Sequence, residues 1–298
     1  MINTKVIKAT GLALALLSST VFADRAATSD YKGRVLLVAS SSNTLTFKDG
    51  RTHPTGYFLG ELVVPSQTFI KAGYEVVIAT PDGNTPALDA NSITAEHFEG
   101  SAAKLADAMR FVTTYPGMQK PKTLGEVVHS GLDSFDGIYL PGGHAPMVDL
   151  MQDKNLGMAL RQFHASGKAT GLLCHGPIAL SSSTDNPEKF RAAMVSDDVS
   201  AATNFAPNWI YKGYNMTVYS TTEEKSVEKF LGGDIQFYME DALTAAGGNV
   251  LVKAPGTPFI VEDRELVTGQ NPNSAHMIAE AMVRKLDAQV AQRRSASK

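Results

Sequence analysis

The sequence predicts an α/β fold: a three-layer sandwich in which a mostly parallel central sheet lies between two layers of helices. Short apolar runs alternate with amphipathic stretches along most of the chain. The runs are apolar through their middles, as expected of strands that are covered on both faces. The sole cysteine, Cys174, directly follows one such run and precedes Gly176-Pro177. This order predicts a sharp strand-to-helix turn with the thiol at its tip, a nucleophile elbow.

Residues 1–23 have the features of a secretory signal peptide. Lys5 and Lys8 form a basic region, residues 11–17 are apolar, and Val21-Phe22-Ala23 places small residues before the expected cleavage after Ala23. The apolar run is shorter than the roughly 20 residues that a membrane span needs, and no other stretch approaches that length. We therefore expect an exported protein, periplasmic or secreted, without stable membrane association once the signal is removed.

The next part of the chain predicts a right-handed βαβ unit. Residues 33–39 are expected to form a buried strand, residues 59–73 a helix that stops at a glycine, and residues 75–80 a second strand before a Pro-Asp-Gly turn. Residues 87–130 then break the alternation, with helical segments but few strand signals. Because this length exceeds that of an ordinary connection, we expect an inserted helical lid there.

The remaining elements continue the alternation. A strand over 135–140 runs into Pro141-Gly142-Gly143-His144, and a strand over 169–173 precedes Cys174. Further along we expect a helix near 156–165, a strand over 214–220, a helix that begins near Thr221, a helix over 234–246, a strand over 250–253, a hairpin over 259–268 and an amphipathic helix over 275–286. These elements predict one domain over 24–290, followed by a polar tail over 291–298.

Composition excludes several classes of protein. The 27 basic and 30 acidic residues nearly balance, and no basic run indicates a nucleic-acid partner. A single cysteine cannot form a disulfide within the chain, although exported proteins usually pair their cysteines. The alternative to a reactive thiol is a buried cysteine with a purely structural role. The flanking glycines and the adjacent histidine favour a reactive thiol, whose pKa the following helix N-terminus is expected to lower.

The candidate active site lies at the carboxyl ends of the parallel strands. There, a thiolate of Cys174 would attack a carbonyl carbon, and the N–H groups of Gly143 and His175 would hold the developing oxyanion. His175, turned toward Glu224, would act as acid or base. The alternative for Glu224 is a charge that only stabilises a helix N-terminus.

Glu61, in the first crossover helix, allows two interpretations. On a solvated helix face it would have no chemical role. Buried beside Cys174, its pKa would rise and it would donate a hydrogen bond to the sulfur. A metal site is not expected, because the histidines are scattered and no pair has helical i, i+4 spacing. Besides His175 and His276, they are His53, His97, His129, His144 and His164.

Five segments in the same order resemble the ThiJ/PfpI superfamily, which has the class I glutamine amidotransferase-like fold. The closest branch is that of the glyoxalase III-like heat-shock chaperones, and the resemblance spans about residues 33–286. The segments are Thr55-Gly56-Tyr57-Phe58-Leu59-Gly60-Glu61, Ala72-Gly73-Tyr74-Glu75-Val76 with Ala79-Thr80-Pro81-Asp82-Gly83, Leu140-Pro141-Gly142-Gly143-His144, Leu173-Cys174-His175-Gly176-Pro177, and Leu266-Val267-Thr268-Gly269-Gln270-Asn271-Pro272 with Ser274-Ala275-His276.

The resemblance implies Cys174 as nucleophile, with Glu61 as the carboxylic acid that touches the thiol and Glu224 as the acid that orients His175. It also implies cofactor-free conversion of methylglyoxal to lactate. Two positions depart from the family pattern. Ala145 stands where a glycine is frequent, and Ile70 occupies the place of a histidine ligand in metal-binding members. The second departure argues against metal.

We therefore expect a cofactor-independent, glyoxalase III-type lyase that acts on a small aldehyde. Cys174 would add to a 2-oxoaldehyde as a hemithioacetal, and a proton would move between the two carbons with Glu61 or His175 as shuttle. One alternative is a cysteine amidase, peptidase or protein deglycase. Another is a stress-response holdase chaperone or a redox sensor that uses Cys174 without turnover. Whether the protein is a homodimer is left open.

Overall fold

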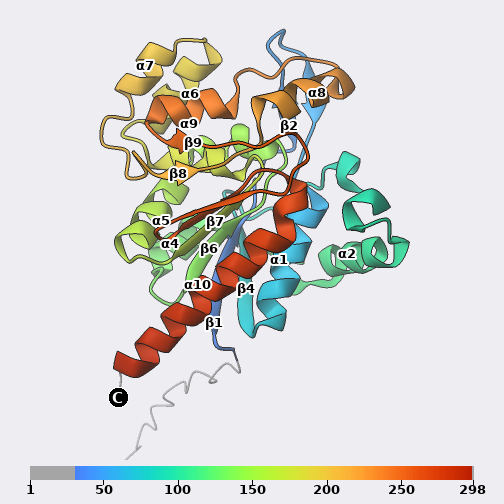
Figure 1. The fold of residues 1–298 in the computed structure, drawn as a ribbon, viewed down its shortest axis with the longest axis vertical. Coiled ribbons are helices and arrows are strands. Elements are labelled where there is room, and N and C mark those ends of the chain that lie inside the picture. Colours follow the sequence, from blue (N-terminus) through green and yellow to red (C-terminus); the bar gives the residue numbers. More distant parts are fainter. Residues whose placement is uncertain (1–30, 297–298) are drawn as a thin grey trace, which may run out of the picture. The chain divides into compact units, whose positions relative to one another are not determined.

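The structure, a computed structural model, describes residues 31–296; the signal peptide expected at 1–23 lies outside the described residues. A seven-stranded sheet with the order β10-β11-β7-β6-β1-β4-β5 forms the centre (Figure 1). All neighbours are parallel except β10 and β11. The predicted α/β class with a mostly parallel sheet is confirmed. The strands are β1 Gly33–Val38, β4 Tyr74–Thr80, β5 Lys122–Thr123, β6 Gly137–Leu140, β7 Ala169–Leu173, β10 Ile260–Asp263 and β11 Leu266–Gly269.

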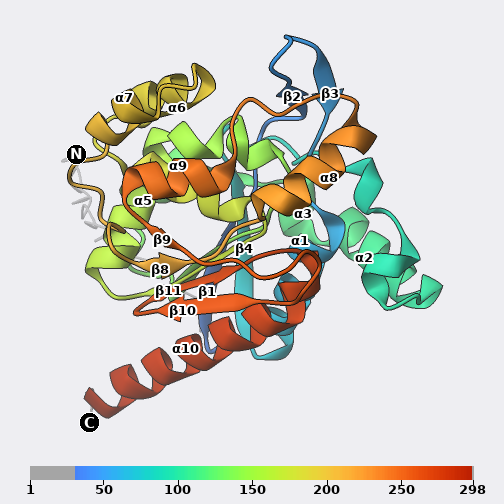
Figure 2. The same ribbon diagram turned by 45° about the horizontal axis from the view of Figure 1, so that its top comes forward.

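Helices cover both faces of the sheet, as Figure 2 shows. On one face lie α1 (Leu59–Lys71) and α10 (Ala275–Ala296), with α2 (Ala102–Thr114) outside α1. On the other lie α4 (Leu124–Ser130), α5 (Lys154–Ala165) and the 3₁₀ helix η5 (Gly176–Ser183). The remaining helices are α3 Pro116–Gln119, α6 Pro187–Val195, α7 Val199–Asn204, α8 Thr221–Leu231 and α9 Met239–Ala246.

Two hydrophobic cores follow from these layers. Successive side chains of a strand point to opposite faces. In β1, Val35 and Leu37 therefore enter the core under α1 and α10, while Leu36 and Val38 enter the core under α5. All four side chains are fully buried, which explains why this strand has no polar position in its centre.

The expected strand over 214–220 is wrong as a member of the central sheet. Only β8 (Asn215–Met216) is a strand, and it pairs with β9 (Asn249–Val250) in a separate sheet. Strand β11 already has β10 on one edge and β7 on the other, so it offers no backbone to a further strand. The chain beyond β8 instead attaches through the Thr217 N–H, which donates to the Thr268 hydroxyl. The hairpin predicted over 259–268 is confirmed as β10 and β11.

The segment 87–130 divides into two parts. Its first part contains the 3₁₀ helices η1 (Ala90–Ser92) and η2 (Ala95–Phe98) and then α2, which packs on α1. Its second part returns to the sheet, where β5 extends the edge beside β4. The weak strand signal has a simple cause, since β5 is 2 residues long.

Two other local features differ from what the sequence indicated. The segment between β1 and α1, for which no strand was expected, contains a hairpin of β2 (Thr44–Thr46) and β3 (Thr52–Pro54). Residues 291–296 are helical rather than a tail, and Arg293 forms an ion pair with buried Asp136.

Among residues 31–296, no helix combines the length and apolar character that crossing a bilayer requires.

Candidate active site

Cys174 lies at the end of β7 on a turn that leads into η5. Its φ of 59° is unusual for a residue with a side chain, and such conformations persist where neighbouring contacts enforce them. Here the Cys174 N–H donates to the Gly269 carbonyl at 2.8 Å, and its own carbonyl accepts from the Tyr219 N–H at 2.9 Å. The predicted sharp turn is present. The helix after it is a tight 3₁₀ helix instead of an α-helix, and serine hydroxyls within it donate to carbonyls three residues earlier.

The glycines after β6 allow the backbone to pass very close to the turn at Cys174. A Cβ on Gly142 would lie 2.7 Å from Glu61 Oε2 and 2.8 Å from the Cys174 Cβ. A Cβ on Gly143, which has a φ of 90°, would lie 2.1 Å from the Gly56 carbonyl oxygen. Within the described residues, neither the Gly143 N–H nor the His175 N–H donates a hydrogen bond. Both residues line the same cavity as Cys174, where these donors can meet an oxyanion.

The structure brings Cys174, His175 and Glu224 together as a hydrogen-bonded chain. His175 Nδ1 lies 3.2 Å from Cys174 Sγ, and His175 Nε2 lies 2.7 Å from Glu224 Oε2. Ser220 caps α8, and this cap places Glu224 in the first turn. Because the carboxylate accepts from Nε2, the lone pair of Nδ1 faces the sulfur and can take its proton.

A second histidine, His144, contacts the other oxygen of the same carboxylate. Its Nε2 lies 2.7 Å from Glu224 Oε1, and its ring centroid lies 4.1 Å from that of His175. We did not predict this contact, because sequence reasoning grouped His144 with the scattered histidines. Its position directly after β6 was the available signal, since β6 and β7 end at the same edge of the sheet.

The pKa values of His144, His175 and Glu224 shift in different directions. Burial opposes a charge on His144, but the attraction of Glu224 outweighs it and raises the pKa of His144. Burial and the charge of His144 lower the pKa of His175. The two imidazoles hold the pKa of Glu224 well below its usual range despite its burial. These shifts favour a positive charge on His144, a negative charge on Glu224 and a neutral His175, which is then free to act as a base.

Glu61 is fully buried at the start of α1, so the solvated-face alternative is wrong. Its Oε2 accepts from the Gly142 N–H at 2.8 Å. Its Oε1 has no partner with hydrogen-bond geometry among the described residues, although the carboxyl lies close enough to the Cys174 thiol for each to shift the other's pKa. Burial raises the pKa of Glu61 to about 8, so this side chain is mainly a neutral acid at pH 7.

The expectation of a low thiol pKa is wrong for the ligand-free site. Burial raises the pKa of Cys174 well above its ordinary value, and the nearby acids Glu61 and Glu224 act in the same direction. The short η5 does not overcome this combination. When Glu61 is protonated its charge no longer opposes the thiolate, but the sulfur is still buried. We therefore expect the thiol to ionise by giving its proton to His175.

His144, His175 and Glu224 also form a group that could hold a metal ion, with ligand atoms within 4.8 Å of one another. The argument from i, i+4 spacing did not detect this group, because its members come from three separate elements. In the present geometry each Nε2 lies 2.7 Å from a separate oxygen of Glu224, which fits two hydrogen bonds. A metal would have to separate these pairs, so the residues fit a proton-relay role better.

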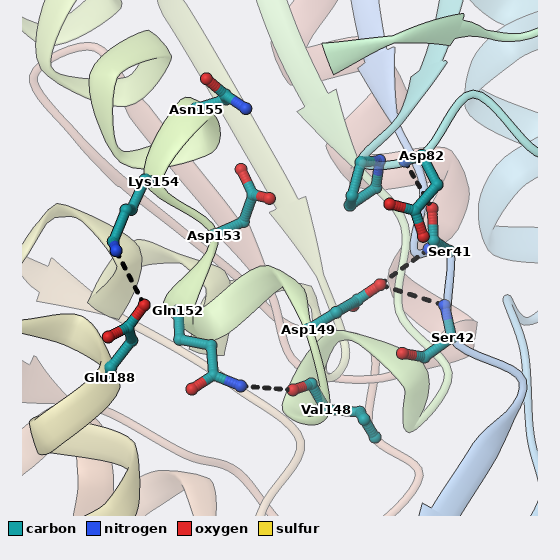
Figure 3. A pocket seen from close by; sticks show the side chains of 11 residues that line it. Ser41, Ser42, Asp82, Val148, Asp149, Gln152, Asp153, Lys154, Asn155 and Glu188 are labelled. Atoms are coloured by element: carbon teal, nitrogen blue, oxygen red, sulfur yellow. Dashed lines mark hydrogen bonds and ion pairs between the residues drawn. The ribbon is translucent and has the colours of Figure 1, made fainter. Parts of the chain in front are cut away.

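Figure 3 shows a different, more polar cavity of about 620 Å³. Asp149 accepts there from the N–H groups of Ser41 and Ser42 at 2.8 and 3.0 Å, and Lys154 pairs with Glu188 at 2.9 Å. These contacts anchor the loop after β1. None of the site residues predicted from the sequence lies in this cavity.

Comparisons with known proteins agree with this geometry. Residues 53–289 match a family model described as ThiJ/PfpI family-like. The protein/nucleic acid deglycase HchA of Staphylococcus aureus (strain Newman) is 26% identical over 267 residues, which are 86% of this chain and 81% of that protein. The X-ray structure of Rapid Encystment Protein REP24 from Francisella tularensis is 23% identical with a TM-score of 0.64, covering 85% of this chain and 99% of that one. The crystal structure of glyoxalase III from Candida albicans is 22% identical with a TM-score of 0.59, covering 86% and 98%. These two structures share the fold.

Proposed function

Because this chain belongs to the ThiJ/PfpI family, we propose that it is a cofactor-independent lyase of the glyoxalase III type, which converts 2-oxoaldehydes into 2-hydroxy acids. Relatives named as a deglycase and as a glyoxalase III support this class of chemistry. The observation that carries the specific choice is the buried, protonated Glu61 beside Cys174. A hydrolase needs only the Cys174, His175 and Glu224 chain, whereas a lyase also needs a group that moves a proton between two carbons.

The first step forms a bond between Cys174 Sγ and the aldehyde carbon. His175 Nδ1, at 3.2 Å from the sulfur, takes the thiol proton, and Glu61 gives its proton to the aldehyde oxygen. The product is a neutral hemithioacetal beside an ionised Glu61 and a protonated His175. Glu224 stabilises the imidazolium through its contact with Nε2.

The second step moves the proton. Ionised Glu61 removes the hydrogen of the former aldehyde carbon while His175 protonates the neighbouring oxygen, and an enediol results. Glu61 then delivers its proton to the second carbon and recovers one from the first hydroxyl, which leaves a thioester of the 2-hydroxy acid. Water hydrolyses this thioester and frees the thiol, so the net change is the addition of one water to the oxoaldehyde. A pKa of about 8 for Glu61 suits a group that must give and take a proton near neutral pH.

Product analysis with methylglyoxal tests the proposal. The wild-type protein should form lactate without added cofactor, and Cys174→Ala should form none above the uncatalysed rate. Met158→Ala, at an exposed position on α5, is the matched control and should retain wild-type turnover. Lactate formation that survives in Cys174→Ala would refute the covalent route, and a wild type that forms no 2-hydroxy acid from either methylglyoxal or phenylglyoxal would refute the lyase.

A protein deglycase is the second candidate, because the S. aureus relative carries that name. The same Cys174, His175 and Glu224 chain can attack an acyl or hemiaminal carbon. Release of free amine from a methylglyoxal-treated peptide, measured after all free methylglyoxal has been removed, separates this activity from lyase turnover.

We also propose that the protein is exported, on the basis of the features of residues 1–23. The measurement is the N-terminal sequence of the mature protein from fractionated cells. Asp24 at the N-terminus in an exported fraction supports the proposal, and Met1 in a cytoplasmic fraction contradicts it.

A further inference from the structure

The cavity at Cys174 has a floor and a wall of different character. Its volume is about 340 Å³, and its floor carries the polar groups of the proposed reaction. The wall takes no part in that reaction and is mainly apolar, although Asp89 and Asn91 also line the cavity. We call this wall the apolar rim; it consists of Phe58, Tyr219, Val227, Phe230, Leu231 and Pro272.

Helix α8 supplies both Glu224, which positions His175, and half of the apolar rim. Glu224, Val227 and Leu231 are separated by three and four residues, so they lie on one helical face. Glu224 is buried at the inner end of this face, and Phe230 stands at the outer end with 88% of its surface exposed. The next most exposed large apolar side chain among the described residues, Tyr31, is 49% exposed. Phe230 therefore presents an almost bare ring at the mouth of the cavity, where a bound molecule can cover it.

The size of the cavity favours substrates larger than methylglyoxal. The volume of about 340 Å³ lies in the range of small-molecule sites, and it corresponds to the liquid volume of roughly eleven water molecules. A three-carbon oxoaldehyde bonded to Cys174 would fill the floor and leave the rim in water. A larger apolar group on the same substrate would displace that water and gain hydrophobic contact.

The charge of the cavity excludes a further class. No lysine or arginine is among its lining residues within the described part of the chain, and Asp89 contributes a carboxyl group. An anionic substituent such as a carboxylate or phosphate would find no lysine or arginine there, and the imidazole of His144 is already paired with Glu224. A neutral, apolar group therefore fits the rim better than an anionic one.

We propose that the preferred substrates are 2-oxoaldehydes whose 2-oxo carbon carries an aromatic or branched alkyl group, and that Phe230 determines this specificity. The inference rests on the proposed function, because it assumes that Cys174 binds the aldehyde carbon. With that carbon fixed at the floor, the substituent extends toward α8 and packs against Val227, Phe230 and Leu231.

Steady-state kinetics with phenylglyoxal and methylglyoxal test this specificity. In the wild type, kcat/KM should be at least about tenfold higher for phenylglyoxal, in keeping with what apolar pocket contacts contribute to discrimination. Phe230→Ala should reduce the ratio of the two kcat/KM values by about tenfold, chiefly through phenylglyoxal. Met158→Ala removes an exposed apolar side chain that does not line the cavity, so it should leave the ratio unchanged.

The outcomes distinguish a failure of the specificity proposal from a failure of the proposed lyase function. If methylglyoxal is used as well as phenylglyoxal, or if Phe230→Ala lowers both values equally, the specificity proposal is wrong while the lyase stands. If neither aldehyde yields a hydroxy acid, the proposed function fails and this inference fails with it. If Phe230→Ala weakens only the suppression of aggregation of an unfolded protein, the rim binds polypeptide, and the specificity proposal is again overturned.

Discussion

Replacing Glu61 by Gln should remove a pH-dependent loss of stability from the wild-type protein. Glu61 is fully buried, and burial raises its pKa from 4.5 to about 8. Between these values the folded protein retains a proton that the unfolded chain has released. The free energy of unfolding must therefore fall as the pH rises through this window. One pKa unit corresponds to about 1.4 kcal/mol, so the loss attributable to Glu61 amounts to up to about 5 kcal/mol at pH 8.

Glutamine isolates this effect because it has the same shape and does not titrate. Its amide oxygen can accept the Gly142 N–H bond that Glu61 Oε2 accepts at 2.8 Å. Its NH₂ group can face the sulfur as the protonated carboxyl does. We expect the two proteins to have similar stability near pH 5 and Glu61→Gln to become increasingly more stable than the wild type toward pH 8.

Urea denaturation at several pH values from 5 to 8 measures the difference. Glu280→Gln, at an exposed position on α10, is the matched control and should give a curve parallel to that of the wild type. Parallel curves for Glu61→Gln and the wild type would show that Glu61 does not hold a proton in the folded protein. The same variant should lose on the order of 10²–10⁴ in lactate formation, because it cannot move a proton. Full turnover would leave His175 as the only shuttle.

Three further predictions concern the surroundings of this centre. His144→Gln removes a positive charge that lowers the pKa of His175, so that pKa should rise and the acid limb of the kcat/KM profile should move to higher pH. Gly143→Ala should lower the free energy of unfolding, measured by urea denaturation, by about 3 kcal/mol or more, because its Cβ would lie 2.1 Å from a carbonyl oxygen. The control Gly131→Ala, with a similar φ and open space around it, should lower the free energy of unfolding by only about 1–2 kcal/mol. Dialysis against a chelator should leave lactate formation unchanged, while added zinc should inhibit it by binding the two imidazoles; activity lost to the chelator and restored by zinc would contradict the proton-relay assignment.

Local patterns in the sequence were sufficient for the main frame of the fold. Mostly apolar runs correctly predicted β1, β4, β6 and β7, because a strand covered on both faces has few polar positions. The glycines around Cys174 and after β6 predicted close backbone approaches, and the structure has them. The order of strands also placed Cys174, Gly143 and Glu61 near one edge of the sheet.

Other features depend on contacts between distant segments, which local patterns do not contain. Residues 214–220 have strand-like composition, yet β11 had no free edge to receive them. His144 joined Glu224 only because β6 ends beside β7. The protonation states were likewise decided by the tertiary structure. Burial and neighbouring charge set the pKa values of Glu61 and Cys174, and both depend on which side chains the fold brings together.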